Sequence, residues 1–319
     1  MKKTIYCSII IVVFSLVLSA CYNETKAARN GNLNRWGDIT VAPSKRALNE
    51  SLSDEPLSVQ DEPDFPEDSY DYQMPVTVVE GQTFINFLGM KMIWVDSGKF
   101  VMGREESAQR MKVSINGTWP LRTVTVRQGF WIAQTEVTQG QYKQLRGSNP
   151  SHFKGNYHPV DSVSWKESVQ FCRLLTERQG ASEFVYLLPS EAQWEYACRA
   201  TSTAIFYGPE LGPLAWYFPN SKNLTHRVKV KTPNAWGLFD MLGNVDEWCS
   251  DHFSHTYHDA PLDESSRQDI GTVRRVVRGG SYDSRYVKEI SSSGRRGAGP
   301  AYRYSKTGFR PVMVLKRSR

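Results

Sequence analysis

Cysteine is scarce in this 319-residue sequence, which has five, and none follows Cys249. Two of the five belong to the N-terminal region, so Cys172, Cys198 and Cys249 are the thiols of the remaining chain. Three thiols allow at most one internal disulfide, which excludes a small scaffold held by several disulfides. The chain beyond Cys249 has no cysteine, so it cannot supply a thiolate ligand to a soft metal there.

Long hydrophobic runs are equally scarce, because only the N-terminus has one. Met1-Lys2-Lys3 precedes a mostly apolar run from Ile5 to Leu18, and Leu18-Ser19-Ala20-Cys21 follows it. A basic start before an apolar middle is typical of a secretory signal. Its end is similar to the bacterial lipobox, in which the cysteine is acylated and becomes the first residue of the mature protein. An uncleaved membrane anchor is the less favoured alternative, because the run is short for a spanning helix.

We therefore predict a lipoprotein signal peptide over residues 1–20 and lipidation at Cys21. Two or more acyl chains, at about 0.8 kcal/mol per buried methylene, hold a protein stably on a membrane. Tyr22 stands where an Asp would favour retention, which resembles lipoproteins that are passed to the outer membrane. The predicted location is the bacterial cell envelope, at the surface of the outer membrane, with the lipid anchor as the membrane contact.

Apolar periodicity is missing from residues 21–75, which are rich in Ser, Asn, Pro and charge and become acidic in their second half. Such a segment buries too little apolar surface to offset its chain entropy, so we predict a flexible acidic tether. Residues 76–319 show no internal repeat and are within the size range of one domain.

Positive charge gathers near the C-terminus of this chain, whose formal net charge is +6. A basic face favours acidic partners. Nucleic acid is not expected among them, because an exported lipoprotein rarely meets it. The basic residues are Arg274, Arg275, Arg278, Arg285, Lys288, Arg295, Arg296, Arg303, Lys306, Arg310 and Lys316.

Local patterns predict strands in the first part of the domain. Residues 92–95 and 98–103 are predicted to pair as a hairpin around Asp96-Ser97, and residues 122–126 and 130–132 as further strands. Helices are expected after the N-cap residues Thr138, Ser164 and Ser190, over 139–145, over 165–178 and from 191 onward. The apolar faces of the second and third helices are predicted to be Val169, Cys172 and Leu175, and Trp194, Ala197 and Cys198.

Two apolar segments frame an irregular stretch near the C-terminus. Val276-Val277 before Gly279-Gly280, and Phe309 with Val312, are predicted as buried strand ends. Between them, residues 283–286 and 294–306 hold mostly Ser, Gly, Tyr, Arg, Ala and Asp without a helical or strand period. Tyr gives rigid contact area, Arg gives planar donors, and Ser and Gly adapt their hydrogen bonds, as in antibody loops. Composition alone still favours a plain solvated loop over a binding surface.

Ordered motifs from about residue 88 to the end resemble the formylglycine-generating enzyme (sulfatase-modifying factor) family. The resemblance implies one α+β domain of the C-type-lectin-like fold with little regular secondary structure. The motifs are Trp94-Val95 to Met102-Gly103, Glu136-Val137-Thr138, Asn149-Pro150-Ser151-His152-Phe153, Pro159-Val160 to Val163-Ser164-Trp165, Leu188 to Ala197, Pro233 to Met241, Gly243-Asn244-Val245-Asp246-Glu247-Trp248, Arg278 to Tyr282 and Gly308-Phe309-Arg310.

The family's catalytic thiolates are missing from the matching positions. Its enzymes bind copper through two cysteines, and here Ser284 and Glu289 stand in their places. Neither is a soft ligand for Cu(I), so no copper is expected and we predict that the protein is not an enzyme. The disulfide partners that the family implies for Cys172 and Cys198 are also missing, so these two thiols are expected to be buried and free.

One metal site remains in the resemblance. Asp240, Gly243, Val245 and Glu247 match positions where the family binds calcium through two side chains and two carbonyls. Hard oxygen ligands suit Ca²⁺, so a structural calcium ion is predicted, the alternative being that both acids cap or solvate a turn. His252 and two later histidines, spaced three apart, lie in a polar segment and are expected to be surface residues.

The favoured function is a surface-displayed lipoprotein that binds an unknown protein or glycan. The lipid anchor, the tether and the loop composition together resemble variable lipoproteins of diversity-generating retroelements, which diversify loops on this scaffold. The alternatives are a non-catalytic structural subunit of an envelope assembly and an oxidoreductase of the family with unrecognised chemistry. The predicted ligand-binding residues are Tyr282, Asp283, Ser284, Arg285, Tyr286, Gly294, Arg296, Gly297, Gly299, Tyr302, Tyr304 and Ser305.

Overall fold

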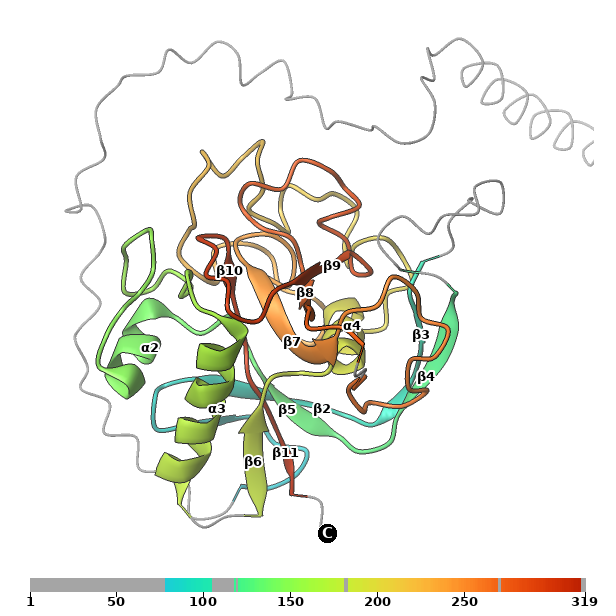
Figure 1. Ribbon diagram of the computed structural model, residues 1–319, viewed down its shortest axis with the longest axis horizontal. Helices are drawn as coiled ribbons and strands as arrows, with labels where there is room; N and C mark the ends of the chain where they lie inside the picture. Colours follow the sequence, from blue (N-terminus) through green and yellow to red (C-terminus); the bar gives the residue numbers. More distant parts are fainter. Residues whose placement is uncertain (1–77, 105–117, 119, 181–182, 269–270, 317–319) are drawn as a thin grey trace, which may run out of the picture. The chain divides into compact units, whose positions relative to one another are not determined.

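A five-stranded antiparallel sheet underlies much of the core (Figure 1). The structure, a computed structural model, describes residues 78–104, 118, 120–180, 183–268 and 271–316. The predicted signal peptide, Cys21 and the tether lie outside these residues. The sheet has the order β1-β2-β5-β11-β6, with β1 at Phe84–Ile85, β2 at Lys91–Val95, β5 at Phe130–Ala133, β11 at Val312–Leu315 and β6 at Phe184–Leu187.

A second sheet collects strands from the C-terminal part of the chain. Its order is β10-β7-β8-β9, with β10 parallel to β7 and the other pairs antiparallel. The strands are β7 (Asp246–His252), β8 (Arg275–Arg278), β9 (Arg295–Ala298) and β10 (Thr307–Gly308). A separate pair joins β3 (Gly98–Met102) to β4 (Arg122–Val126).

Three helices begin at the predicted N-caps. Each cap hydroxyl accepts a hydrogen bond from the backbone N–H three residues on, and the side chain there returns the bond, which satisfies two otherwise unpaired donors. These capping boxes confirm the three predicted helix starts. The helices are α2 (Gln139–Arg146) after Thr138, α3 (Trp165–Gln179) after Ser164 and α4 (Glu191–Arg199) after Ser190.

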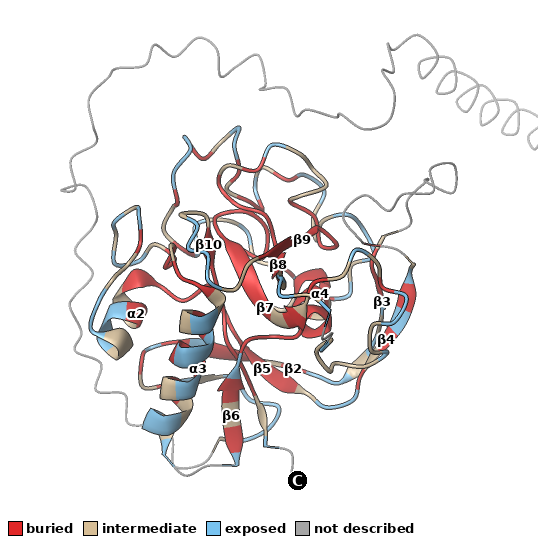
Figure 2. Ribbon diagram, in the orientation of Figure 1, coloured by how far each residue is buried: buried red, intermediate tan, exposed pale blue. Residues whose placement is uncertain are grey.

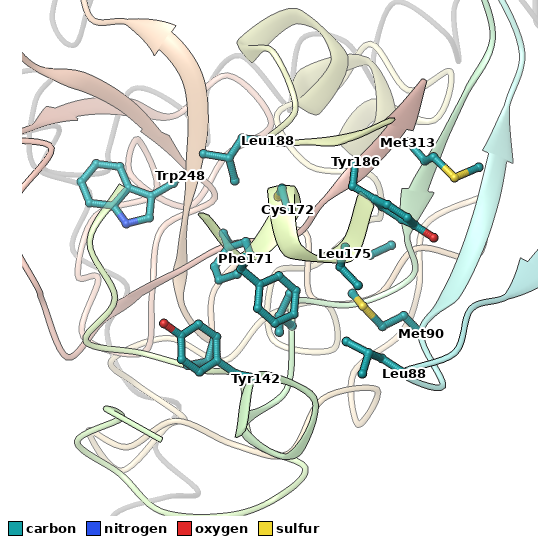
Figure 3. Packing of buried hydrophobic residues seen from close by; sticks show 14 of the residues in the cluster. Leu88, Met90, Tyr142, Phe171, Cys172, Leu175, Tyr186, Leu188, Trp248 and Met313 are labelled. Carbon is teal, nitrogen blue, oxygen red and sulfur yellow. The ribbon is translucent and has the colours of Figure 1, made fainter. Parts of the chain in front are cut away.

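The core lies between the helices and the sheets, whose facing sides are buried (Figure 2). Figure 3 shows Phe171, Cys172 and Leu175 of α3 in one apolar cluster with Tyr186 and Met313. Trp194, Ala197 and Cys198 of α4 belong to a second cluster and are fully buried, as predicted. Cys172, Cys198 and Cys249 are free and buried, which confirms the expectation for the first two.

Two predictions about these elements are wrong. Residues 92–95 and 98–102 do not form a hairpin, because β2 pairs with β1 and β5 while β3 pairs with β4. Strand partners are set by contacts remote in sequence, which a local turn signal does not report. Val169 is 37% exposed and does not belong to the apolar face of α3.

The stretch 294–306, which shows no strand period in its sequence, contains one strand. Residues 295–298 form β9, which pairs with β8 from Arg275↔Ala298 to Arg278↔Arg295. Gly279 and Gly280 follow β8 with φ of 93° and 72°, which glycine adopts without steric cost, as the predicted turn requires. Within the described ranges, no helix combines the length and apolar content that crossing a membrane takes.

Candidate functional site

A cleft of about 200 Å³ lies over the second sheet, where the 280–289 loop, β9 and the start of β7 meet. Its lining brings together half of the predicted ligand-binding residues and the two positions that match the family's copper thiolates. The lining includes neither Cys nor His. The residues are Asp246, Val277, Arg278, Gly280, Asp283, Ser284, Arg285, Tyr286, Glu289, Gly294, Arg295, Arg296 and Lys306.

Buried arginines fix the floor of this cleft. Arg278 is fully buried, pairs with Glu195 and donates to the carbonyls of Ser292, Ser293 and Gly294 at 2.8 to 2.9 Å. Despite the cost of burial, the carboxylate of Glu195 raises the pKa of Arg278 and keeps it charged. Arg295 is also buried, and it forms a bidentate ion pair with Glu191. The floor is therefore a rigid support and its guanidiniums are already engaged.

Ser284 and Glu289 occupy the copper positions with ordinary structural contacts. The Ser284 hydroxyl accepts a hydrogen bond from the backbone N–H of Ser281 at 3.1 Å. Glu289 accepts from the backbone N–H groups of Arg285 and Tyr286 at 3.2 and 3.4 Å. These contacts shape the loop, and no imidazole or thiolate in the lining could activate the hydroxyl.

Two stacked tyrosines stand at the rim on the 299–306 loop. Tyr302 is 61% exposed and Tyr304 is 36% exposed, with ring centroids 5.5 Å apart. Arg303 pairs with Glu167 at 2.6 Å, and the Tyr304 carbonyl accepts from the N–H of Ser162 at 3.0 Å. Arg303 and Tyr304 thus anchor the loop directly after Tyr302, whose ring is left for contact.

Arg296 departs from its predicted role as an exposed display residue. Its side chain is half-buried and donates to Asp246, with Nε at 3.1 Å, and to the Thr307 hydroxyl at 2.9 Å. The guanidinium also lies 5.5 Å from the Tyr304 ring centroid. Arg296 joins β9 to β7 and supports Tyr304, so it belongs to the framework.

Four other predicted residues are buried. Tyr282 packs edge-on against Phe153, with its hydroxyl at 3.2 Å from that of Ser305, and Ser284 is 8% exposed. A Cβ at Gly294 would lie 2.5 Å from the Glu289 carbonyl oxygen, and one at Gly297 would lie 2.5 Å from the Phe253 ring. Real Cβ atoms do not approach so closely, so these glycines are required for packing.

The remaining predicted residues are accessible. Arg285, Tyr302 and Tyr304 are exposed, and Asp283, Tyr286, Gly299 and Ser305 are half-buried. Sequence reasoning missed Phe218, which is 39% exposed and carries the Arg285 guanidinium at 3.5 Å from its ring centroid. No local signal links these positions, which come from different loops.

The predicted calcium residues have mixed surroundings. Asp240 is buried, its Oδ2 accepts from the Lys229 N–H at 2.8 Å, and its Oδ1 has no hydrogen-bond partner. The Glu247 carboxylate accepts hydrogen bonds from Arg310, which donates to both of its oxygens, and from the Trp194 indole N–H at 2.7 Å. Among the described residues, no group of three or more His, Cys, Asp or Glu could hold a metal ion.

Buried carboxylate oxygens without hydrogen-bond partners nevertheless occur around Asp240. Glu136 is fully buried near Asp240, and neither of its carboxylate oxygens has a hydrogen-bond partner. Burial, followed by the charge of Asp240, holds the pKa of Glu136 well above its usual range. Burial likewise raises the pKa of Asp240 to about 6. A cation beside Asp240 Oδ1 would stabilise the ionised carboxylate, whereas Glu247 is already neutralised by Arg310.

Together, the sheets, the three helices and the loop-built cleft define a C-type-lectin-like α+β domain of the formylglycine-generating-enzyme type. The chain belongs to the sulfatase-modifying factor enzyme 1-like domain family, whose model matches residues 77–315.

Three known proteins illustrate the similarity. PvdO from Pseudomonas aeruginosa has a TM-score of 0.66 and 26% identity, covering 75% of this chain and all of that one. Treponema denticola variable protein 1 has a TM-score of 0.64 and 26% identity, covering 72% and 98%. The formylglycine-generating enzyme of Streptomyces coelicolor is 34% identical over 201 residues, which are 57% of this chain. The match spans 60% of that enzyme, less than two thirds of its length.

Proposed function

We propose that the protein is a binding protein that presents the cleft and its rim as a ligand-binding surface on a lectin-like scaffold. The observation that carries this proposal is the exchange at the family's reactive position, where Ser284 and Glu289 replace thiolates and share the cleft with the exposed Arg285 and the half-buried Tyr286. Rigid aromatic and guanidinium groups on an anchored loop contribute contact area at low entropy cost. The expected ligand is a protein or a glycan.

The accessible residues define the display surface of this proposal. It consists of Asp283, Arg285, Tyr286, Tyr302, Tyr304 and Ser305. Gly299 is accessible but belongs to the framework, because a Cβ there would lie 2.5 Å from the Tyr302 ring. Similarity to the Treponema variable protein supports the idea that these positions are diversified by a retroelement. The buried predicted residues and Arg296 are the framework, because their replacement would disturb packing or the ion pair with Asp246.

The proposal places the domain outside the cell. Acylation at Cys21 would anchor the chain in the outer membrane, and residues 21–75 would give the domain reach. Nucleic acid is not among the proposed partners. Catalysis by copper is not proposed, because neither Ser284 nor Glu289 supplies the thiolate that Cu(I) prefers.

A structural calcium ion is the second element of the proposal. Asp240 Oδ1 and the carbonyls of Gly243 and Val245 would be its main ligands, with Glu247 shared with Arg310. The buried Oδ1 without a partner is the observation that favours it, because a buried carboxylate oxygen is costly when unpaired. The ion would stabilise the turn beneath the second sheet and would take no part in chemistry.

A paired selection experiment tests the binding function. One library randomises the six display residues, and a control library randomises six exposed residues of α3, both selected against serum albumin after equal enrichment for folding. We expect saturable binders from the display library only. Equal recovery of binders from both libraries, or from neither, would contradict the proposal. The control positions are Lys166, Val169, Gln170, Arg173, Glu177 and Arg178.

A further inference from the structure

Arg285 differs from the other cations of the cleft because it has no acidic partner among the described residues. It is exposed, and the contact that fixes it is the Phe218 ring beneath its guanidinium. The other cations of the lining pair with carboxylates: Arg278 with Glu195, Arg295 with Glu191, Arg296 with Asp246 and Lys306 with Asp283.

The Phe218 ring supports the Arg285 guanidinium. The guanidinium carbon lies 3.5 Å from the ring centroid, and the Phe218 N–H donates to the Ser284 carbonyl at 3.2 Å, which ties the two loops together. Nearby, the Ser221 hydroxyl donates to the Tyr282 carbonyl at 2.7 Å. Stacking engages the face of a guanidinium and leaves its N–H edge open, so the donors of Arg285 are oriented and available to a ligand.

We propose that Arg285 on Phe218 is the recognition point for a carboxylate group of the ligand. This inference rests on the proposed binding function and names the ligand chemistry of the same cleft. It applies to the sequence in which residue 285 is Arg. A planar guanidinium fork matches a carboxylate through two parallel charge-assisted hydrogen bonds. A cation that is already stacked loses less entropy on binding than a free side chain does.

The rest of the lining favours a singly charged group over a phosphate. Glu289 also lines the cleft and has no cationic partner among the described residues, while Asp283 and Asp246 are each balanced by one cation. With the other cations paired, the charges of Arg285 and Glu289 cancel, so the lining has no net positive charge to hold a dianion. These carboxylates can also accept hydrogen bonds from hydroxyl or amide groups of the same ligand. An acidic peptide side chain and a sugar acid both have this chemistry.

The test is an NMR titration of the full chain with ¹⁵N-labelled arginine. The probes are N-acetyl-glutamate N-methylamide and methyl galacturonoside, at constant ionic strength, with the glutamine analogue, methyl galactoside and inorganic phosphate as comparisons. We expect a saturable shift of the Arg285 Nε–H signal by a carboxylate probe, with an affinity on the order of millimolar for this single contact. The peptide and sugar arms distinguish the two sources.

Variants separate recognition from general charge. Arg285→Gln should weaken carboxylate binding at least roughly tenfold, read from the Tyr286 ring signals, because both charge-assisted bonds are lost. Arg285→Lys should keep part of the affinity, and Phe218→Ala should weaken it severalfold by releasing the guanidinium. Arg173→Gln, an exposed arginine paired with Glu177 on α3, is the matched control and should bind like the wild type.

Three outcomes would overturn the inference: no saturable shift, an equal shift with the neutral probes or phosphate, or unchanged affinity in Arg285→Gln. None of them would contradict the binding function itself, because the display library replaces Arg285 and is scored on serum albumin. Conversely, carboxylate binding together with a display library that yields no binders would point to a small-molecule site. The two failures are therefore distinguishable.

Discussion

Replacing Phe309 should separate the framework from the display surface energetically. Its ring is fully buried against α3 and α2, with the Phe171 centroid at 5.2 Å and the Tyr142 centroid at 6.4 Å, both edge-on. Phe309→Ala removes this packing and leaves a cavity, so the free energy of unfolding should fall by about 3 to 5 kcal/mol. Phe309→Leu should recover much of that loss, because it conserves most of the volume.

The matched variants are on the rim of the cleft. Tyr302→Ala removes a side chain that is 61% exposed, so the free energy of unfolding should change by only about 0.5 kcal/mol. Arg285→Ala should behave similarly, because its described side-chain contact is the half-exposed Phe218. Urea denaturation, with the midpoint and slope fitted separately, measures all of them. If Tyr302→Ala and Phe309→Ala lose comparable stability, the rim is core packing and the separation is wrong.

Four further predictions concern lipidation, copper chemistry, calcium and the pH dependence of stability. Cys21→Ser should abolish labelling by a fatty acid in cells, and equal labelling of both proteins would contradict lipidation. The purified protein should form no formylglycine on a sulfatase peptide with copper, as read by mass spectrometry, because the thiolates are replaced. Chelation should lower the melting temperature of the wild type but not of Asp240→Ala, since a ligand of the folded state stabilises it, and an unchanged wild-type melt would remove the calcium site. Burial, followed by the charge of Glu191, raises the pKa of Asp251 to about 7, above its unfolded value. The stabilising contribution of protonated Asp251 is therefore complete below about pH 4 and is lost as the pH rises to about 7. Asp251→Asn should flatten the fall of the unfolding free energy with pH by up to about 1.4 kcal/mol per pH unit.

Elements whose signals are local could be predicted from the sequence. Thr138, Ser164 and Ser190 predict the starts of three helices, because a capping box lies within four consecutive residues. The partner of β2 could not be read in this way, because β5 comes from a separate segment and no turn joins them. Register and partner choice depend on the assembled sheet.

The site shows the same limit. The Gly, Ser, Tyr and Arg composition located the loops of the cleft, but it could not separate display residues from framework. Gly297 is fixed by the Phe253 ring, and Arg296 by Asp246, neither of which is near it in sequence. Phe218 was missed for the same reason, since only the folded chain brings it under Arg285.

The most direct test of the central claim is the natural variation of the codons for the display surface. The gene and its flanking DNA are sequenced from many cells of one population. We predict a neighbouring reverse transcriptase gene, an adenine-rich near-copy of the codons for residues 280–310, and substitutions concentrated at Asp283, Arg285, Tyr286, Tyr302, Tyr304 and Ser305. Tyr282, Gly294 and Gly297 should stay unchanged, because they are packed. Invariant display codons without a near-copy, or substitutions spread evenly over the buried glycines, would contradict the account.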